Sequence, residues 1–129
     1  MNVIGVGVAL VDLARVSRLR ASKGEHAKHR FFTDAERAYL ATRPDPTGHA
    51  AARIAAKEAV YKALQSLPDA RGVGWREIEV LRDEDGRPAI RLHGQAALLA
   101  EAQGGLLVQV SLTHSATAAG AVAVIGTTR

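Results

Sequence analysis

The fold of this chain is decided by the stretch Arg53-Ile54-Ala55-Ala56-Lys57-Glu58-Ala59-Val60-Tyr61-Lys62-Ala63-Leu64. The stretch has no Gly or Pro and is rich in Ala, which predicts a helix. At about 100° per residue, Ala52 and several of its alanines fall on one narrow stripe. Such a stripe of small side chains lets a helix pack closely against a sheet or another helix, so we expect this helix to be central to the fold.

Another face of the expected helix is charged. Glu58 and Lys62 lie side by side on the helical wheel, and Arg53 and Lys57 form a second pair further round. This face could meet an anion or a metal ion. Alternatively, Glu58 and Lys62 form only a surface pair four residues apart, worth about 0.2–0.5 kcal/mol. The helical-wheel positions of Glu58 and Lys62, taken alone, favour the interpretation as a surface pair.

The length and composition of the chain limit the kinds of protein that it can be. With 129 residues, the chain is expected to form one domain spanning residues 1–129. Aromatic residues make up only 4% of the chain, so aliphatic side chains must build most of the core. There is no cysteine, which excludes disulfides, thiolate metal sites and a cysteine nucleophile. We find no apolar run long enough for a membrane span and no signal-peptide pattern, and we therefore expect a cytoplasmic protein.

The charge balance indicates an anionic partner. The formal net charge is +4 and the sequence pI is about 10.0. Nucleic acid, an acidic protein and a phosphorylated cofactor all fit this charge. Single-strand binders usually add aromatic stacking platforms, and two Phe, two Tyr and one Trp offer little material for them. Nucleic acid is therefore the weaker interpretation.

The remaining segments predict an α+β fold with a largely antiparallel sheet. In the first half we expect a strand at 3–11 whose two glycines permit close backbone approach, a helix after Asp12, a loop or frayed helix end at 22–30, and a capping box at 33–36. A break at 43–48 precedes the long helix, which we expect to begin near His49. In the second half we expect strands at 77–81, 88–92, 107–112 and 118–125, a hairpin turn at 83–86 and a helix at 95–102.

The central stretch closely resembles the signature R-(F/W)-A-A-K-E-A-x-x-K-A-L of holo-(acyl-carrier-protein) synthases, the small bacterial 4'-phosphopantetheinyl transferases. Other stretches resemble family patterns in the same order, so the resemblance covers nearly the whole chain. It implies the 4'-phosphopantetheinyl transferase fold, with a long central helix packed on a largely antiparallel sheet. The matching stretches are Gly5–Arg15 with G-I-G-x-D-I-x-E-I-x-R, 32–36 with (F/L)-T-x-x-E, Asp85-Gly86-Arg87-Pro88 with N-G-K-P, and Val110–His114 with V-S-(I/L)-(S/T)-H.

One departure from the family concerns a metal ligand. The chain has Ala9 where the family pattern has an aspartate that binds magnesium. Asp12 matches a later acidic position, but three residues along a strand it need not point the same way as residue 9. The resemblance then leaves Glu58 as the carboxylate candidate for Mg²⁺, with Mn²⁺ as a possible substitute. Magnesium keeps several waters, so one carboxylate together with substrate phosphates can suffice.

The resemblance implies transfer of the 4'-phosphopantetheine arm of coenzyme A to a serine of an acyl carrier protein, as in fatty acid biosynthesis. Glu58 and Lys62 are then the catalytic candidates. Coenzyme A is expected to contact Lys62 and His114 through its phosphates and the turn Asp85, Gly86, Arg87 and Pro88 through its adenine. Arg53 and Lys57 serve either structure or the 3'-phosphate of the nucleotide. Arg15, with Arg18 as a helper, is expected to meet the acidic recognition helix of the carrier protein.

The family also implies a homotrimer whose active sites lie between subunits. Three hypotheses stay open at this stage. In the first, the chain is an active transferase. In the second, it is a natural or engineered variant that binds coenzyme A or carrier protein with weak or no catalysis because of Ala9. In the third and more distant one, it is a nucleic-acid-binding domain. The modified carrier protein is expected to belong to a fatty-acid, polyketide or peptide synthase.

Overall fold

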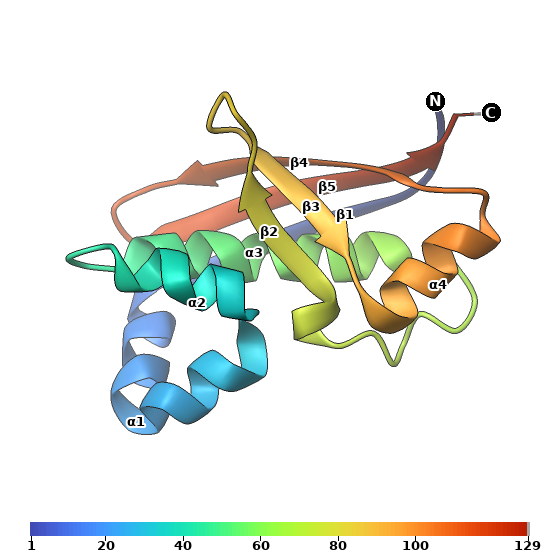
Figure 1. Cartoon of the computed structure of the whole chain (residues 1–129). Coiled ribbons are helices and arrows are strands. Elements are labelled where there is room, and N and C mark those ends of the chain that lie inside the picture. The colour runs from blue at the N-terminus through green and yellow to red at the C-terminus, as the bar shows by residue number, and fades with distance from the viewer. Residues whose placement is uncertain (129) are drawn as a thin grey trace.

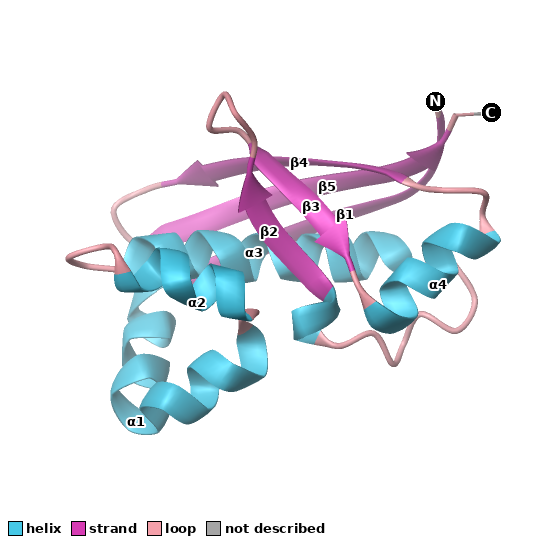
Figure 2. Ribbon diagram, in the orientation of Figure 1, coloured by secondary structure: helices cyan, strands magenta, loops and turns pink. Residues whose placement is uncertain are grey.

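The computed structural model of the protein describes residues 1–128, apart from the side chain of Lys23. One strand is followed by three helices, then by a hairpin, a fourth helix and two further strands (Figures 1 and 2). In chain order they are β1 (Asn2–Asp12), α1 (Leu13–Phe31), α2 (Asp34–Ala41), α3 (Thr47–Leu64), the 3-10 turn η1 (Trp75–Glu77), β2 (Ile78–Arg82), β3 (Pro88–Leu92), α4 (Gly94–Ala102), β4 (Leu107–His114) and β5 (Ala118–Thr127).

The strands form two antiparallel sheets. The larger has the order β1-β5-β4, and the smaller is the β2–β3 hairpin. The antiparallel α+β prediction is therefore confirmed. Both β4 and β5 run further than expected, and β4 includes His114. No helix within residues 1–128 combines the length and apolar character needed to cross a bilayer.

Helix α3 lies across one face of the larger sheet and forms the centre of the core (Figure 1). Of the predicted stripe, Ala56, Ala59 and Ala63 are fully buried, whereas Ala52 is half-buried and lines a cavity. The packing stripe is therefore confirmed over its last three positions. Gly5 and Gly7 of β1 face the helix so closely that an added Cβ would overlap the backbone carbonyls of Ala63 and Ala59. The predicted close approach at the two glycines is therefore confirmed, and it fixes how α3 sits on β1.

Helix α1 corrects one prediction. Residues 22–30, expected to be a loop or frayed end, continue the helix to Phe31, with a non-helical Gly24 (φ 49°, ψ −121°) in between. A positive φ is easily adopted by glycine, so Gly24 lets the chain change direction. The second half gains a packing face through buried Ala27 and half-buried Phe31, and polar composition alone does not reveal that face. Helix α3 also begins two residues earlier than expected, at Thr47.

Candidate functional site

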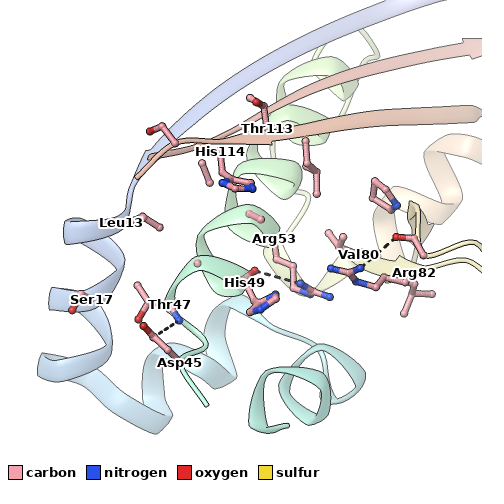
Figure 3. A pocket seen from close by; sticks show the side chains of 18 of the residues that line it. Leu13, Ser17, Asp45, Thr47, His49, Arg53, Val80, Arg82, Thr113 and His114 are labelled. Carbon is pink, nitrogen blue, oxygen red and sulfur yellow. Dashed lines mark hydrogen bonds between the residues drawn. The ribbon is translucent and has the colours of Figure 1, made fainter. Parts of the chain in front are cut away.

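A cavity of about 800 Å³ lies between the first turns of α1, the start of α3, the β2–β3 hairpin and the end of β4 (Figure 3). It brings together four of the residues that the sequence singled out. Arg53 reaches it from α3, His114 from β4, and Gly86 and Pro88 from the hairpin turn. Leu13, Ala52 and Leu112 contribute apolar surface. An apolar cleft with a few polar groups is the usual form of a small-molecule site.

Cations without counter-charges gather beside this cavity. The guanidinium carbons of Arg53, Arg43 and Arg82 lie 4.0, 4.6 and 5.5 Å from the centre of the Tyr39 ring, within range of cation–π attraction. Within residues 1–128 none of these three arginines has an ion-pair partner. The charges of Tyr39 and Glu36 act on Arg53 in the stabilising direction, and the carboxylate of Asp45, which accepts from the N–H of Thr47, also lines the cavity. No carboxylate pairs directly with any of the three arginines, so an anion bound beside them would be stabilised.

Arg53 is the most constrained of these cations. The residue is 5% exposed, its Nη1 donates to the carbonyl of His49 at 3.4 Å, and its buried Nε has no hydrogen-bond partner among the described residues. Burial lowers the pKa of Arg53, an effect that nearby Tyr39 opposes. Burial, followed by the charges of Arg43 and Arg53, also lowers the pKa of His49. An unpaired donor on a desolvated cation is a strong indication of a missing anionic partner.

Glu58, Lys62 and Arg15 lie outside this cavity. Arg15 Nη2 lies 3.5 Å from Glu58 Oε1, and Lys62 Nζ donates to the carbonyl of Val8 at 2.8 Å. Arg15 and Glu58 line a second, much smaller cavity of about 30 Å³ between α1 and α3, together with Phe31 and Trp75. The structure of one chain therefore separates the expected site residues into two groups.

Lys57 belongs to the interior. Its ammonium group donates to the carbonyls of Trp75 at 2.9 Å and Ile78 at 2.7 Å, and it pairs with Glu36 Oε1 at 2.6 Å. Both side chains of the pair are fully buried. Burial lowers the pKa of Lys57, and Glu36 opposes that shift. Of the two roles the sequence left open for Lys57, these contacts support structure, because no donor of the ammonium remains for a phosphate.

The other candidate site residues, Asp85 and Arg87 in the β2–β3 turn and Arg18 on α1, are exposed. In the hairpin turn, Asp83 Oδ1 accepts from the backbone N–H groups of Asp85 and Arg87 at 2.9 Å each, and Gly86 has φ 80°. Asp85 and Arg87 do not line the cavity, so they hold the turn while Gly86 and Pro88 face the cleft. Arg18 is exposed on α1.

The donor atoms around Glu58 decide which metal site is possible. Ala9 is 4% exposed on the inward face of β1 and offers no oxygen ligand. Asp12 is exposed and lies on the opposite face of β1 from Ala9, so it does not replace the absent aspartate. No three His, Cys, Asp or Glu side chains within the described part of the chain form a metal-binding group. Glu58 alone fits Mg²⁺ only when phosphate oxygens of a ligand and water complete the coordination shell.

Sequence reasoning missed the cluster of Arg43, Arg82, His49 and Tyr39. Arg43 and His49 flank the break before α3, and Arg82 ends β2, so no helical or strand periodicity connects them. The only available signal was the excess of arginine over nearby carboxylates. Packing around the Tyr39 ring, which spacing along the chain does not reveal, brings them together.

The α+β fold and a cavity flanked by arginines without ion-pair partners are features typical of proteins that bind a phosphorylated small molecule. Comparison with known proteins narrows this class. Residues 5–119 match the model of the 4'-phosphopantetheinyl transferase superfamily, and the chain belongs to this family.

Individual relatives agree with this assignment. The chain is 45% identical over 101 residues to the holo-[acyl-carrier-protein] synthase of Rhodopirellula baltica, covering 78% of this chain and 79% of the relative. It is 42% identical over 123 residues to that of Gloeobacter violaceus, covering 94% and 92%. Among solved structures, the ACPS–CoA complex of Chronobacterium ammoniagenes superposes with a TM-score of 0.80 at 33% identity, covering 97% of this chain and 98% of that chain.

Proposed function

We propose that this protein transfers the 4'-phosphopantetheine arm of coenzyme A to a serine hydroxyl of an apo acyl carrier protein, releasing adenosine 3',5'-bisphosphate. The single observation that carries the proposal is the cavity with its unpaired, partly desolvated arginines, which matches the several phosphates of coenzyme A. A relative of the same fold is a coenzyme A complex, and several relatives are holo-[acyl-carrier-protein] synthases. We assign the activity to the cytoplasm and to fatty acid biosynthesis.

The cavity would take the nucleotide end of coenzyme A. Arg53, which lines the cavity, would bind the 3'-phosphate, assisted by Arg43 and Arg82. The turn around Gly86 and Pro88 would lie against the adenine, and His114 would contact a phosphate of the pyrophosphate. Each contact uses a group that already faces the cavity, or lies beside it, in the free protein.

The reaction forms a bond between the serine oxygen and the β-phosphorus and breaks the bond from that phosphorus to the bridging oxygen. Adenosine 3',5'-bisphosphate leaves with the bridging oxygen, and the serine proton passes to solvent water. Charge develops on the phosphate oxygens, so a preorganised cation close to them speeds the step. Lys62 would supply that cation from α3. Mg²⁺ or Mn²⁺, held by Glu58 and the phosphates, would supply further charge neutralisation. Arg15, with Arg18, would orient the carrier protein so that its serine meets the phosphorus.

A homotrimer with active sites between subunits would unite the two groups of residues. The cavity with Arg53 and His114 and the group with Glu58 and Lys62 are separate in one chain. The outer face of the larger sheet supports self-association, because Val6, Val8 and Leu10 of β1 are 58–72% exposed. Val122, directly opposite Val8 on β5, extends this apolar face.

A second candidate function is binding without efficient catalysis. It is favoured by the absence of a carboxylate at Ala9 and by the Arg15–Glu58 contact, which engages the remaining metal ligand. In that case coenzyme A and carrier protein would both bind, while transfer would be slow.

The proposed division of labour predicts different effects of two substitutions. His114→Ala should weaken coenzyme A binding about ten-fold or more, because it removes a contact to a charged phosphate. Arg15→Ala should leave coenzyme A affinity nearly unchanged and raise the carrier-protein concentration needed for half-maximal rate. Calorimetric titration with coenzyme A and steady-state kinetics at varied carrier protein measure the two effects. An equal loss of both affinities in either variant would refute the division.

A further inference from the structure

The ring of His49 lies at the large cavity with both of its nitrogens free. His49 stands in the first turn of α3 and lines the cavity together with Arg53, whose Nη1 donates to the backbone carbonyl of His49 at 3.4 Å (Figure 3). The half-buried imidazole meets the Tyr39 ring edge-on, with ring centres 5.8 Å apart and an interplanar angle of 74°. Within residues 1–128 neither nitrogen of this imidazole has a hydrogen-bond partner. Both nitrogens are therefore available to a ligand in the cavity.

The charges around His49 are mostly positive. Arg43 precedes α3, Arg53 belongs to α3 itself and Arg82 ends β2. Burial, followed by these three arginines, lowers the pKa of His49 from its ordinary value of 6.5, whereas Asp45 raises it. The positive end of the α3 dipole disfavours a cation at this position as well. At neutral pH the imidazole of His49 is therefore uncharged in the free protein.

Three further groups complete these surroundings. Tyr39 of α2 contacts the imidazole of His49, Arg20 of α1 donates to the hydroxyl of Thr47 at 2.7 Å, and His114 lines the cavity from β4. None of the three adds a carboxylate. Asp45 is thus the one acid in this set, and it already accepts from the N–H of Thr47 at 3.1 Å.

A phosphate bound beside Arg53 would reverse the balance at His49. Its two negative charges would offset the arginines, and a nearby negative charge favours the protonated form of a histidine. A protonated imidazole has two N–H donors and no acceptor, which suits a phosphate better than the neutral ring does. Phosphate binding and protonation of His49 would therefore strengthen each other, by the same factor in both directions.

We propose that His49 takes up a proton from solvent when the 3'-phosphate of coenzyme A binds, and that its imidazolium then donates to this phosphate and favours coenzyme A over 3'-dephospho-coenzyme A. The inference rests on the proposed function, which places the 3'-phosphate beside Arg53. No covalent bond changes in this step. The pKa of His49 is low in the free protein and higher in the complex, so the added affinity is present at low pH and is lost as the pH rises through the pKa of the complex.

Calorimetric titration of the native chain with coenzyme A, without carrier protein, tests this proton uptake. Repeating the titration in buffers of different ionisation enthalpy counts the protons taken up. We expect about half a proton or more per coenzyme A at pH 7, and an affinity that falls about three-fold or more per pH unit up to pH 8. The second pKa of a phosphate is about 6, so the ligand itself is already mostly dianionic in this range. The analogue 3'-dephospho-coenzyme A keeps the pyrophosphate and should bind more weakly, without the proton uptake.

His49→Gln separates proton uptake from a merely structural role. The variant should bind coenzyme A about three- to ten-fold more weakly at pH 7, nearly as well as the native chain at pH 8.5, and without proton uptake. A structural role would weaken binding equally at both pH values. His26→Gln is the matched control, because His26 is exposed on α1 away from the cavity, and it should behave like the native chain. His114→Gln, which changes the other histidine of the cavity, should keep the proton uptake.

The proposal is overturned if coenzyme A binds to the native chain without proton uptake, or if His49→Gln retains the uptake. It is equally overturned if 3'-dephospho-coenzyme A causes the same uptake as coenzyme A, or if His114→Gln abolishes it. In each of these cases coenzyme A still binds, and the proposed function stands. A native chain that binds no coenzyme A at any pH would contradict the proposed function as well.

Discussion

At the scale of the residue, the charged face of α3 separates into three environments. Lys57 is enclosed by protein acceptors, Arg53 is buried with an unpaired donor, and Glu58 stays partly exposed beside Arg15. Buried charges require partners, because transfer from water without them costs several kcal/mol. The Glu36 carboxylate meets this need, since it also accepts from the N–H groups of Thr33 and Val80 at 2.8 Å each. One ion pair thereby joins α2, α3 and β2.

This ion pair leads to a stability prediction. Lys57→Met should lower the free energy of unfolding by about 3–5 kcal/mol, because it leaves the buried carboxylate of Glu36 without its counter-charge. Glu36→Gln should cost a comparable amount, and the double variant should cost less than the sum of the two. Urea unfolding followed by circular dichroism measures these differences.

Lys28→Met is the control for the same chemical change at an exposed pair. Lys28 contacts Glu25 at 3.1 Å, but the side chain of Glu25 is 76% exposed. This variant should change stability little. Equal effects of Lys28→Met and Lys57→Met would contradict the structural role of the buried pair.

The sequence predicted part of this arrangement. The signature placed Arg53, Lys57 and Glu58 on one helix and named the turn at Gly86 and His114, and the cavity does bring Arg53, Gly86 and His114 together. Helical spacing did not separate Lys57 from Arg53, because the partner Glu36 lies on another helix. The capping box at Thr33 identified Glu36 only as a local cap, whereas its second oxygen serves β2.

At the scale of the element, the contact between β1 and α3 was the most predictable. Glycines in a strand and alanines in a helix each permit close approach, and here they face each other. Helix α1 was less predictable. Residues 22–30 are polar, and their helical order depends on Gly24 and on packing against distant parts of the chain. Tertiary contacts therefore outweigh local composition in this segment.

The β1–α3 contact predicts an asymmetry between two glycine substitutions. Gly7→Ala should destabilise the protein by about 1–3 kcal/mol or more, because the new methyl group would overlap the carbonyl of Ala59. Gly72→Ala is the control, since no heavy atom lies within 4 Å of an added Cβ there. In thermal unfolding, the melting temperature of Gly7→Ala should therefore be clearly lower than that of Gly72→Ala. A native melting temperature in Gly7→Ala would contradict the close packing.

At the scale of the whole molecule, the chain leaves an apolar sheet face exposed and divides its candidate site residues into two groups. Both features are explained if copies of the chain associate through this face and complete each other's sites. A substitution that charges the face should then dissociate the assembly and reduce transfer at the same time. Val8 and Leu98 are both 58% exposed, on the sheet face and on α4 respectively.

Val8→Glu should shift the sedimentation behaviour from trimer to monomer at micromolar concentration, because a buried unpaired carboxylate opposes association. Leu98→Glu adds the same charge at equal exposure and should leave the trimer intact. Analytical ultracentrifugation distinguishes the two. A native chain that sediments as a monomer would contradict the proposed assembly.

The proposed reaction itself depends on how well Glu58 acts without a carboxylate at residue 9. Ala9 is packed in the core, so Ala9→Asp should destabilise the free protein by about 1–3 kcal/mol unless a metal ion or nearby cation compensates. It should also provide a second ligand and fix a bound ion against the phosphates. Because Ala9→Asp changes both stability and metal binding, it tests whether Glu58 supports phosphopantetheine transfer without a second carboxylate.

The most direct test is mass spectrometry of apo acyl carrier protein incubated with coenzyme A and either the native protein or Ala9→Asp, with Mg²⁺ and with Mn²⁺. We predict that the native protein slowly adds one phosphopantetheine arm per carrier and that Ala9→Asp does so faster. Full native activity without any gain in Ala9→Asp would show that Glu58 and solvent suffice. A carrier protein that stays unmodified by both proteins, with either metal, would contradict the transferase function.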